Sequence, residues 1–202
     1  FSVMPDVVLE GRRVINNIQR AASLFLMKTM YSSALAALLL FVPLQYPFAP
    51  IHLTLIGAVA SGIPGVVLAL EPNFRRVSKD FMSSVLKRAA AGAITIFCGV
   101  VFAMAFGKYL GITEDEISTV CVIFTGISSL VTLLCSCLPL SVLKGCLVAA
   151  CTAIFAVGVL IFDKLFMLVP LGTAALIMLL AMLPFTVIQY FIRSDSLRKN
   201  KV

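Results

Sequence analysis

Six long apolar stretches constrain the fold of this chain more than any other feature of its sequence. A helix needs about 20 apolar residues to cross a bilayer, and stretches near that length follow one another with short polar segments between them. They cover residues 21–43, 50–70, 89–107, 118–139, 145–162 and 169–192. Because 61% of the residues are hydrophobic and only 12% are charged, a soluble domain is excluded. The sequence predicts an all-α, polytopic, multi-pass protein of the cell membrane with six transmembrane helices.

The basic residues are distributed unevenly between the segments that connect these stretches. Cytoplasmic loops carry an excess of Lys and Arg, so the side with this excess, and with it both termini, is predicted to be cytoplasmic. The opposite side has only Lys108 and Lys164, set among four acidic residues. Anionic lipid accounts for the net charge of +7, and no nucleic acid partner is expected. The basic residues on the cytoplasmic side are Arg12, Arg13, Arg20, Arg75, Arg76, Lys79, Lys87, Arg88, Lys144, Arg193, Arg198, Lys199 and Lys201.

Three regions follow from this pattern. Residues 21–192 form the transmembrane domain, and residues 193–202 form a cytoplasmic basic tail. Residues 1–20 are more polar, but Val14, Ile15 and Ile18 recur at helical spacing, which indicates a helix. We expect this helix to project into the cytoplasm before it enters the bilayer. The segment carries no recognisable beginning of a protein, so we expect the chain to be part of something larger.

The first apolar stretch contains a lysine, Lys28, followed by the hydroxyl residues Thr29, Ser32 and Ser33. Lys28 and Ser32 are four residues apart and therefore share a face of the helix. A lysine in hydrocarbon is costly and is tolerated mainly where it faces a bundle interior, a polar cavity or a counter-charge. Two interpretations stay open: Lys28 faces inward and is functional, or its long side chain extends to the cytoplasmic interface.

The second stretch combines small residues with a helix breaker, Pro64. Small residues allow helices to pack closely, but an interrupted helix at membrane depth can also direct backbone carbonyls at a cation. Two interpretations stay open, close packing through these small residues or a helix unwound over Ser61–Gly65, and both can hold at once. Two adjacent stretches with these features are typical of the wall of a transport site. The residues predicted to line this ion path are Lys28, Thr29, Ser32, Gly57, Ser61 and Pro64.

Two further sets of polar residues give weaker predictions. The fourth stretch carries hydroxyl side chains at helical spacing, which either hold helices together or line a path. They are Thr125, Ser128, Ser129 and Thr132. His52, the only histidine, is expected to be an interfacial anchor, because zinc needs three or four ligands and no companions are visible.

No catalytic constellation is visible in the sequence. It lacks a Gly-x-x-x-x-Gly-Lys-Ser/Thr phosphate loop, a metal-ligand cluster and a Ser/His/Asp set. The six cysteines lie in or beside the apolar stretches, where cysteine behaves as a small hydrophobic residue. Cys135 and Cys137 alone leave a soft-metal site open. We therefore predict no catalytic residue and no cofactor in this chain itself.

Two motifs resemble those of a known family. Glu10–Ile18, with the sequence EGRRVINNI, resembles the stalk of the fifth transmembrane helix of P-type ATPases, where the chain leaves the phosphorylation domain. Gly62-Ile63-Pro64, followed by Leu70-Glu71-Pro72-Asn73, resembles the end of their sixth helix and the start of the next loop. Four further stretches and the basic tail match helices seven to ten. The pattern is most similar to a bacterial calcium-type cation pump.

The resemblance implies that this chain is the C-terminal membrane half of an ATP-driven cation pump. Residues 1–20 would then include the end of the phosphorylation domain. ATP and Mg would bind in the missing cytoplasmic domains, where an aspartyl phosphate forms. The implied partners are the missing N-terminal helices and domains, the lipid bilayer and the transported cation. Calcium is the leading cation, and the implied direction of transport is export.

At the key positions the resemblance is incomplete. Thr29 and Ser32 stand where a calcium pump of the sarcoplasmic reticulum type has an Asn and a Glu on its fifth helix. Gly57, Ala60 and Ser61 stand where its sixth helix has an Asn, a Thr and an Asp. Calcium usually takes about six to eight oxygen ligands, including charged ones, so these two helices alone do not form a full calcium cage. The identity of the metal stays open, and Lys28 would act as a built-in counter-ion.

Two other functions stay open at the level of the sequence. An ATP-independent six-helix transporter or channel would be expected to contain an internal repeat, and none is visible. A structural membrane scaffold would leave the ion chemistry to the missing half of the protein.

Overall fold

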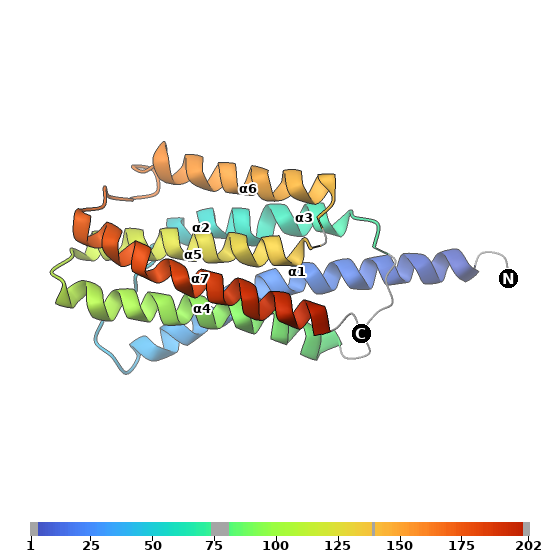
Figure 1. Ribbon diagram of the computed structural model, residues 1–202, viewed down its shortest axis with the longest axis horizontal. Coiled ribbons are helices and arrows are strands. Elements are labelled where there is room, and N and C mark those ends of the chain that lie inside the picture. The colour runs from blue at the N-terminus through green and yellow to red at the C-terminus, as the bar shows by residue number, and fades with distance from the viewer. Residues whose placement is uncertain (1–3, 74–80, 139, 200–202) are drawn as a thin grey trace.

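The structure is a computed structural model that describes residues 4–73, 81–138 and 140–199, with side chains from residues 6 to 193 within these ranges. All regular elements in these ranges are helices (Figure 1). In chain order they are α1 (Met4–Leu39), α2 (Pro50–Gly57), the π-helical turn η1 (Ala58–Gly62), α3 (Ile63–Ala69), α4 (Phe81–Tyr109), α5 (Glu114–Ser136), α6 (Val142–Leu160) and α7 (Thr173–Lys199).

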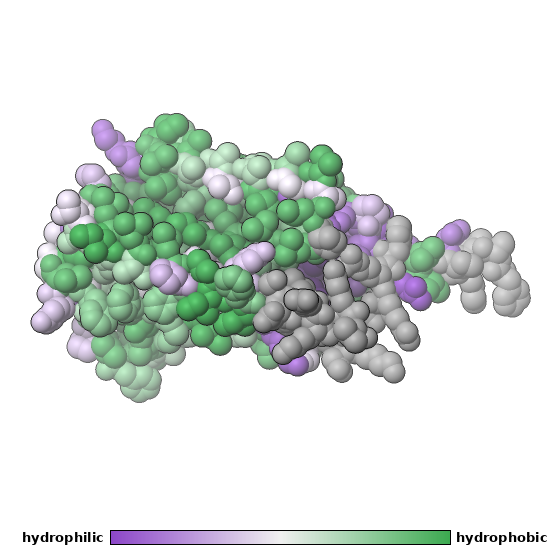
Figure 2. All heavy atoms as spheres, in the orientation of Figure 1, coloured by the Kyte–Doolittle hydropathy of each residue, from purple (hydrophilic) through white to green (hydrophobic). Residues whose placement is uncertain are grey.

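Six of the helical segments are long and apolar enough to cross a membrane, which confirms the predicted fold class. One of them is continuous from Pro50 to Ala69, because α2, η1 and α3 follow each other without a break. The other five lie in α1, α4, α5, α6 and α7. Figure 2 shows hydrophobic side chains spread over the length of the bundle on this face, as a lipid-facing surface requires. The chain is a multi-pass membrane protein.

The two ends of the bundle differ in charge and in the segments that they expose. Both termini lie at the same end (Figure 1). We call it the basic end, because Arg20, Arg88, Lys144 and Arg193 lie there. The connections over residues 40–49, 110–113 and 161–172 form the opposite end.

Helix α1 is longer than the predicted first span. Its 36 residues correspond to about 54 Å at 1.5 Å per residue. Gly11 is its only glycine, and Pro5 its only proline. The predicted stalk and the first membrane crossing are therefore one helix. The basic residues predicted at positions 75, 76 and 79 lie outside the described residues, as do residues 200–202 of the tail.

Local capping explains where the central helix α5 begins. Thr113 accepts a hydrogen bond from the backbone of Glu116, and the Glu116 carboxylate accepts one from the backbone of Thr113. This reciprocal pair satisfies donors that a helix start leaves unpaired. Glu116 also accepts a hydrogen bond of 2.8 Å from the backbone N–H of Gly172. The same carboxylate therefore joins the start of α5 to the connection between α6 and α7.

Helix α5 contacts α1, α2, η1, α4, α6 and α7, so it forms the centre of the bundle. Two glycines bring its neighbours close. A Cβ atom at Gly99 of α4 would collide with the ring of Phe124 on α5, and one at Gly126 of α5 would collide with the ring of Phe155 on α6. Each aromatic ring thus fills the space of a missing side chain on the facing helix. This is the small-residue packing on which helix association in membranes depends.

Gly126→Ala should destabilise the bundle by about 1 to 3 kcal/mol, since an added methyl group in a packed core forces rigid neighbours apart. The matched control is Gly145→Ala on α6, where an added Cβ meets nothing within 4 Å. The free energy of unfolding, measured by SDS titration in mixed micelles, should fall for the first variant only. Equal values for both variants would contradict this account of the α5–α6 packing.

Candidate functional site

The second membrane crossing is interrupted at η1. The N–H of Ile63 donates to the carbonyl of Ala58, five residues earlier, in place of the usual four. Pro64 explains the wider turn, because its ring has no N–H and would clash with the carbonyl of Ala60 in a regular helix. The sequence left unwinding over Ser61–Gly65 open. The structure instead has a π-helical turn that α3 continues directly, with Pro64 in the first turn of α3.

The ammonium group of Lys28 lies against this crossing. Its Nζ donates a hydrogen bond of 3.1 Å to the carbonyl of Leu53 on α2. The same nitrogen is 2.7 Å from the place where a Cβ of Gly57 would be. Gly57 therefore provides the space that the ammonium group fills, one residue before η1 begins. A positive charge therefore lies on the backbone of α2, about one turn before the π-helical turn η1.

The other four residues predicted for the ion path lie in different surroundings. Ser61 is buried, and its hydroxyl donates to the carbonyl of Gly57 at 3.0 Å. Pro64 is buried next to it. Ser32 is half-buried on α1, and Thr29 is exposed, with its hydroxyl bonded to the carbonyl of Phe25 at 3.2 Å. Lys28, Gly57 and Ser61 thus come together, whereas Thr29 faces away from them.

Acidic ligands are missing from this region. Among the described residues, no group of three or more His, Cys, Asp or Glu side chains could hold a metal ion. Within the described ranges, a cation near η1 would meet hydroxyl and carbonyl oxygens and the charge of Lys28. The negative charge that calcium prefers would have to come from other helices.

A second polar region runs along α5 inside the bundle. Ser128 donates to the side chain of Gln189 on α7 at 2.6 Å, and Gln189 donates to Thr132 at 2.5 Å. Thr125 and Ser129 are fully buried, and their hydroxyls have no hydrogen-bond partner among the described residues. Buried polar groups are nearly always paired. Of the four hydroxyl residues predicted on this helix, Ser128 and Thr132 are hydrogen-bonded to Gln189. Thr125 and Ser129 have no hydrogen-bond partner among the described residues.

The sequence missed an ionic cluster at the basic end. Glu71 binds Arg20 of α1 at 2.5 Å with one carboxylate oxygen and Lys144 of α6 at 2.8 Å with the other. The amide of Asn17 donates to the backbone carbonyls of Ala69 and Glu71. All three charged side chains are largely buried. We call Arg20, Glu71 and Lys144 the basic-end cluster; it fixes α1, α6 and the end of α3 to one another.

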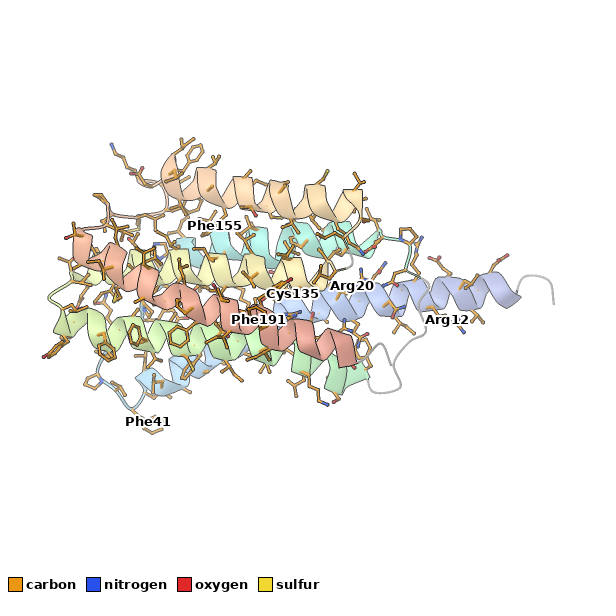
Figure 3. The ribbon with its side chains drawn as sticks, in the orientation of Figure 1. Arg12, Arg20, Phe41, Cys135, Phe155 and Phe191 are labelled. Carbon is orange, nitrogen blue, oxygen red and sulfur yellow. The ribbon has the colours of Figure 1, made fainter. Side chains whose placement is uncertain are left out.

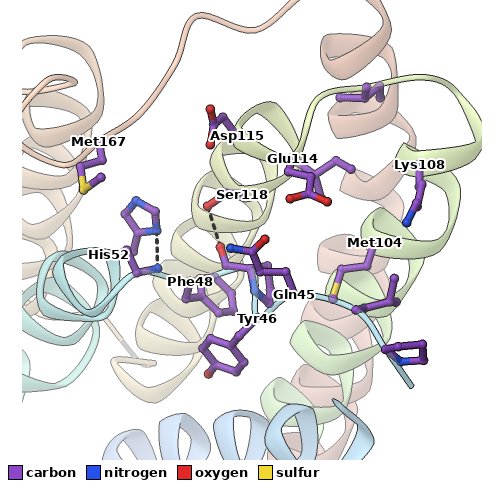
Figure 4. Close-up of a pocket in the computed structure, with 16 residues that line it drawn as sticks. Gln45, Tyr46, Phe48, His52, Met104, Lys108, Glu114, Asp115, Ser118 and Met167 are labelled. Carbon is purple, nitrogen blue, oxygen red and sulfur yellow. Dashed lines mark hydrogen bonds between the residues drawn. The ribbon is translucent and has the colours of Figure 1, made fainter. Parts of the chain in front are cut away.

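His52 is fully engaged by backbone groups at the opposite end. The N–H of Ala49 donates to Nδ1 at 3.1 Å, so Nε2 carries the hydrogen and donates to the carbonyl of Phe166 at 2.8 Å. Neither ring nitrogen is left for a metal in this arrangement. Figure 4 shows His52 beside a cavity of about 410 Å³. Glu114, Asp115 and Lys108 line the same cavity.

The two cysteines considered for a soft metal are Cys135 and Cys137. Both are buried at the basic end. Burial raises the pKa of Cys137 to about 11, so this thiol stays protonated at neutral pH. Metal binding by cysteine requires the thiolate. The surroundings of Cys137 favour a packing role.

Comparison with known proteins identifies the family. Over 156 residues, or 73% of this chain, it is 33% identical to the probable cation-transporting ATPase exp7 of Streptococcus pneumoniae. Over 188 residues, or 84% of the chain, it is 34% identical to the calcium-transporting ATPase CtpE of Mycolicibacterium smegmatis. The chain belongs to the P-type ATPases. It corresponds to part of the membrane region of these pumps.

The alignments cover only a small part of each relative. The chain is 38% identical over 138 residues to the CtpE proteins of Mycobacterium bovis and Mycobacterium tuberculosis, which is 62% of this chain and 17% of each relative. It covers 20% of exp7 and 24% of the M. smegmatis protein. No family model matches the chain. It thus spans about a fifth of the length of the relatives that it matches.

Glu71→Gln should destabilise the P-type ATPase membrane region by about 3 kcal/mol, because it leaves Arg20 and Lys144 buried without their shared counter-charge. The matched control is Glu10→Gln. Glu10 pairs with Arg13 on the surface, where the side chains are 52% and 35% exposed, and its loss should cost at most about 0.5 kcal/mol. Thermal unfolding in detergent measures both. A similar loss for the two variants would show that the basic-end cluster is not a buried anchor.

Proposed function

We propose that this chain forms part of the ion-translocation path of an ATP-driven cation pump. The path would lie between α1 and the crossing formed by α2, η1 and α3. Transport would be coupled to an aspartyl-phosphate cycle, for which ATP and Mg bind in domains outside this chain. The basic end would face the cytoplasm, in accordance with the positive-inside rule. The names of the CtpE relatives favour calcium as the transported cation, and the family resemblance of the sequence favours export.

The observation that carries the proposal is the contact of Lys28 with α2 beside the π-helical turn. Its ammonium group binds the carbonyl of Leu53 and lies over Gly57. It thus lies where a transported cation would seek oxygen ligands. Irregular backbone at membrane depth is tolerated where protein or a polar cavity satisfies it. Here the hydroxyl of Ser61 binds the carbonyl of Gly57, and the ammonium of Lys28 binds the carbonyl of Leu53, both on α2 just before η1.

The ammonium group of Lys28 and the transported ion would occupy the site in turn. Two unit charges about 4 Å apart repel by about 4 kcal/mol at an effective dielectric constant of 20. Lys28 and a bound cation would therefore not occupy the same place together. When the ion arrives, the ammonium group would move to a carboxylate on a neighbouring helix. When the ion leaves, Lys28 would return to Leu53 and stabilise the emptied site.

Calcium would need ligands from outside this chain. Within the described residues, α1 and the following crossing offer Ser32, Ser61 and backbone carbonyls near η1, and calcium prefers carboxylates in addition. Carboxylates of the missing helices would complete the coordination. Thr125 and Ser129, the two buried hydroxyls without partners, would line a second polar route inside the bundle.

Two alternatives make different demands on the same residues. An ATP-independent channel or transporter would conduct ions from this chain alone. A structural scaffold would make Lys28 and Ser61 dispensable for ion affinity. Two relatives that align with most of this chain are named as ATPases, which supports the pump over both alternatives.

Lys28→Met in the complete pump should raise the apparent affinity for the transported cation by about tenfold or more, because it removes a like charge from the site. Turnover should fall, because the emptied site loses its counter-ion. Cation-stimulated ATPase activity and uptake into vesicles measure both effects. Unchanged activity and unchanged affinity would rule out the counter-ion role.

Gly57→Ala should displace the ammonium group without removing its charge. The new Cβ would lie 2.7 Å from Nζ, so the flexible end of Lys28 must leave the Leu53 carbonyl. We expect a change in cation affinity in the same direction as for Lys28→Met, and of smaller size. Gly145→Ala is the matched control. If the two alanine variants have the same cation affinity, then the position of the ammonium group has no part in transport.

A further inference from the structure

An unpaired guanidinium nitrogen lies in the interior of the basic end. Arg193 of α7 is only 4% exposed. Its Nη2 donates to the hydroxyl of Ser136 on α5 at 2.8 Å. Its Nη1 is buried and has no hydrogen-bond partner among the described residues. Leaving a charged donor buried and unpaired is costly, so a missing acceptor is indicated.

The neighbours of Arg193 are cationic. Arg88 lies on α4, which packs against both α1 and α7, within electrostatic range of Arg20 and Arg193. Glu71 already divides its two oxygens between Arg20 and Lys144. Within the described ranges, neither Arg88 nor Arg193 has an acidic partner. Three arginines, one each from α1, α4 and α7, therefore lie at the basic end, and among the described residues only Arg20 of the three pairs with a carboxylate.

We propose that Arg88 and Arg193 bind the phosphate group of an anionic phospholipid at the basic end of the bundle. Guanidinium groups match phosphate oxygens with two parallel hydrogen bonds. Nη1 of Arg193 supplies one donor and Arg88 supplies others. The bound anion relieves the repulsion among the arginines and supplies the acceptor that Nη1 lacks.

The position of the arginines favours a lipid as the source of the phosphate. Ser136 is the last residue of α5, and Arg193 donates a hydrogen bond to it, so the site lies at the basic end of the bundle, where a crossing helix meets the headgroups. Leu86 on α4 and Phe191 and Ile192 on α7 are exposed beside the arginines. Figure 3 shows Phe191 in the part of α7 nearer the basic end. These apolar side chains provide a surface for the acyl chains, and the proposed cytoplasmic orientation places the site in the leaflet that is rich in anionic lipid.

The test uses the complete protein that contains this chain, purified in detergent. Phosphatidylglycerol, phosphatidylcholine and inorganic phosphate are added separately. Native mass spectrometry counts retained lipid, and thermal unfolding measures protection. Neither readout depends on transport, so failure here is distinguishable from failure of the proposed pump function. The variants are Arg193→Gln and Arg88→Gln, with Arg12→Gln on the exposed part of α1 as the matched control.

We expect phosphatidylglycerol, and not phosphatidylcholine, to be retained and to protect the protein. Apparent affinity should fall about tenfold in Arg193→Gln, which loses one charge-assisted contact, and should stay unchanged in Arg12→Gln. Arg88→Gln should weaken binding as well, and it keeps the test valid if Arg193→Gln does not fold. Protection by inorganic phosphate alone would support the anion site and overturn its assignment to lipid. Equal retention by all variants, or no preference for the anionic lipid, would overturn the proposal.

Discussion

A polar or charged group inside hydrocarbon must find its partner within the protein, and this requirement organises the whole molecule. Water is not present there to replace a missing hydrogen bond. The hydroxyls of Thr95, Thr132 and Ser136 accordingly bond to carbonyls of the preceding turn of their own helices. Gln189 joins α7 to α5 through two hydroxyls. Polar groups with an unusual partner, or with no partner among the described residues, are the ones that suggest function.

Lys28 and Glu71 meet the requirement in different ways. Glu71 has two cationic partners, and its cluster joins the middle of α1 to the end of α3 and the start of α6. Lys28 has a neutral partner, the carbonyl of Leu53. A charge bonded to a neutral dipole is held less tightly than one in a buried ion pair. The basic-end cluster is therefore suited to an anchor, and Lys28 to a group that exchanges partners.

The sequence was sufficient to predict the fold class, because about 20 apolar residues in a row allow few structures other than a membrane helix. It was also sufficient to select Lys28 and Pro64, which are unusual in any apolar stretch. It did not predict that Pro64 would produce a π-helical turn, since the choice between unwinding and widening depends on how neighbouring helices pack. The basic-end cluster was missed for a similar reason. Arg20, Glu71 and Lys144 are far apart in the chain, and only the bundle brings them together.

The continuity of α1 has a mechanical consequence. From Arg12 to Leu39 the helix contains neither glycine nor proline, so its hydrogen-bond ladder has no built-in point of bending. Gly11 lies just before this section, and an added side chain there would meet nothing within 4 Å. The stretch after Gly11 behaves as a stiff rod that carries both Arg20 and Lys28. A displacement or tilt of the helix near Gly11 is therefore transmitted with little loss to the ammonium group of Lys28, about 25 Å along the axis, because the two positions move as one rigid body.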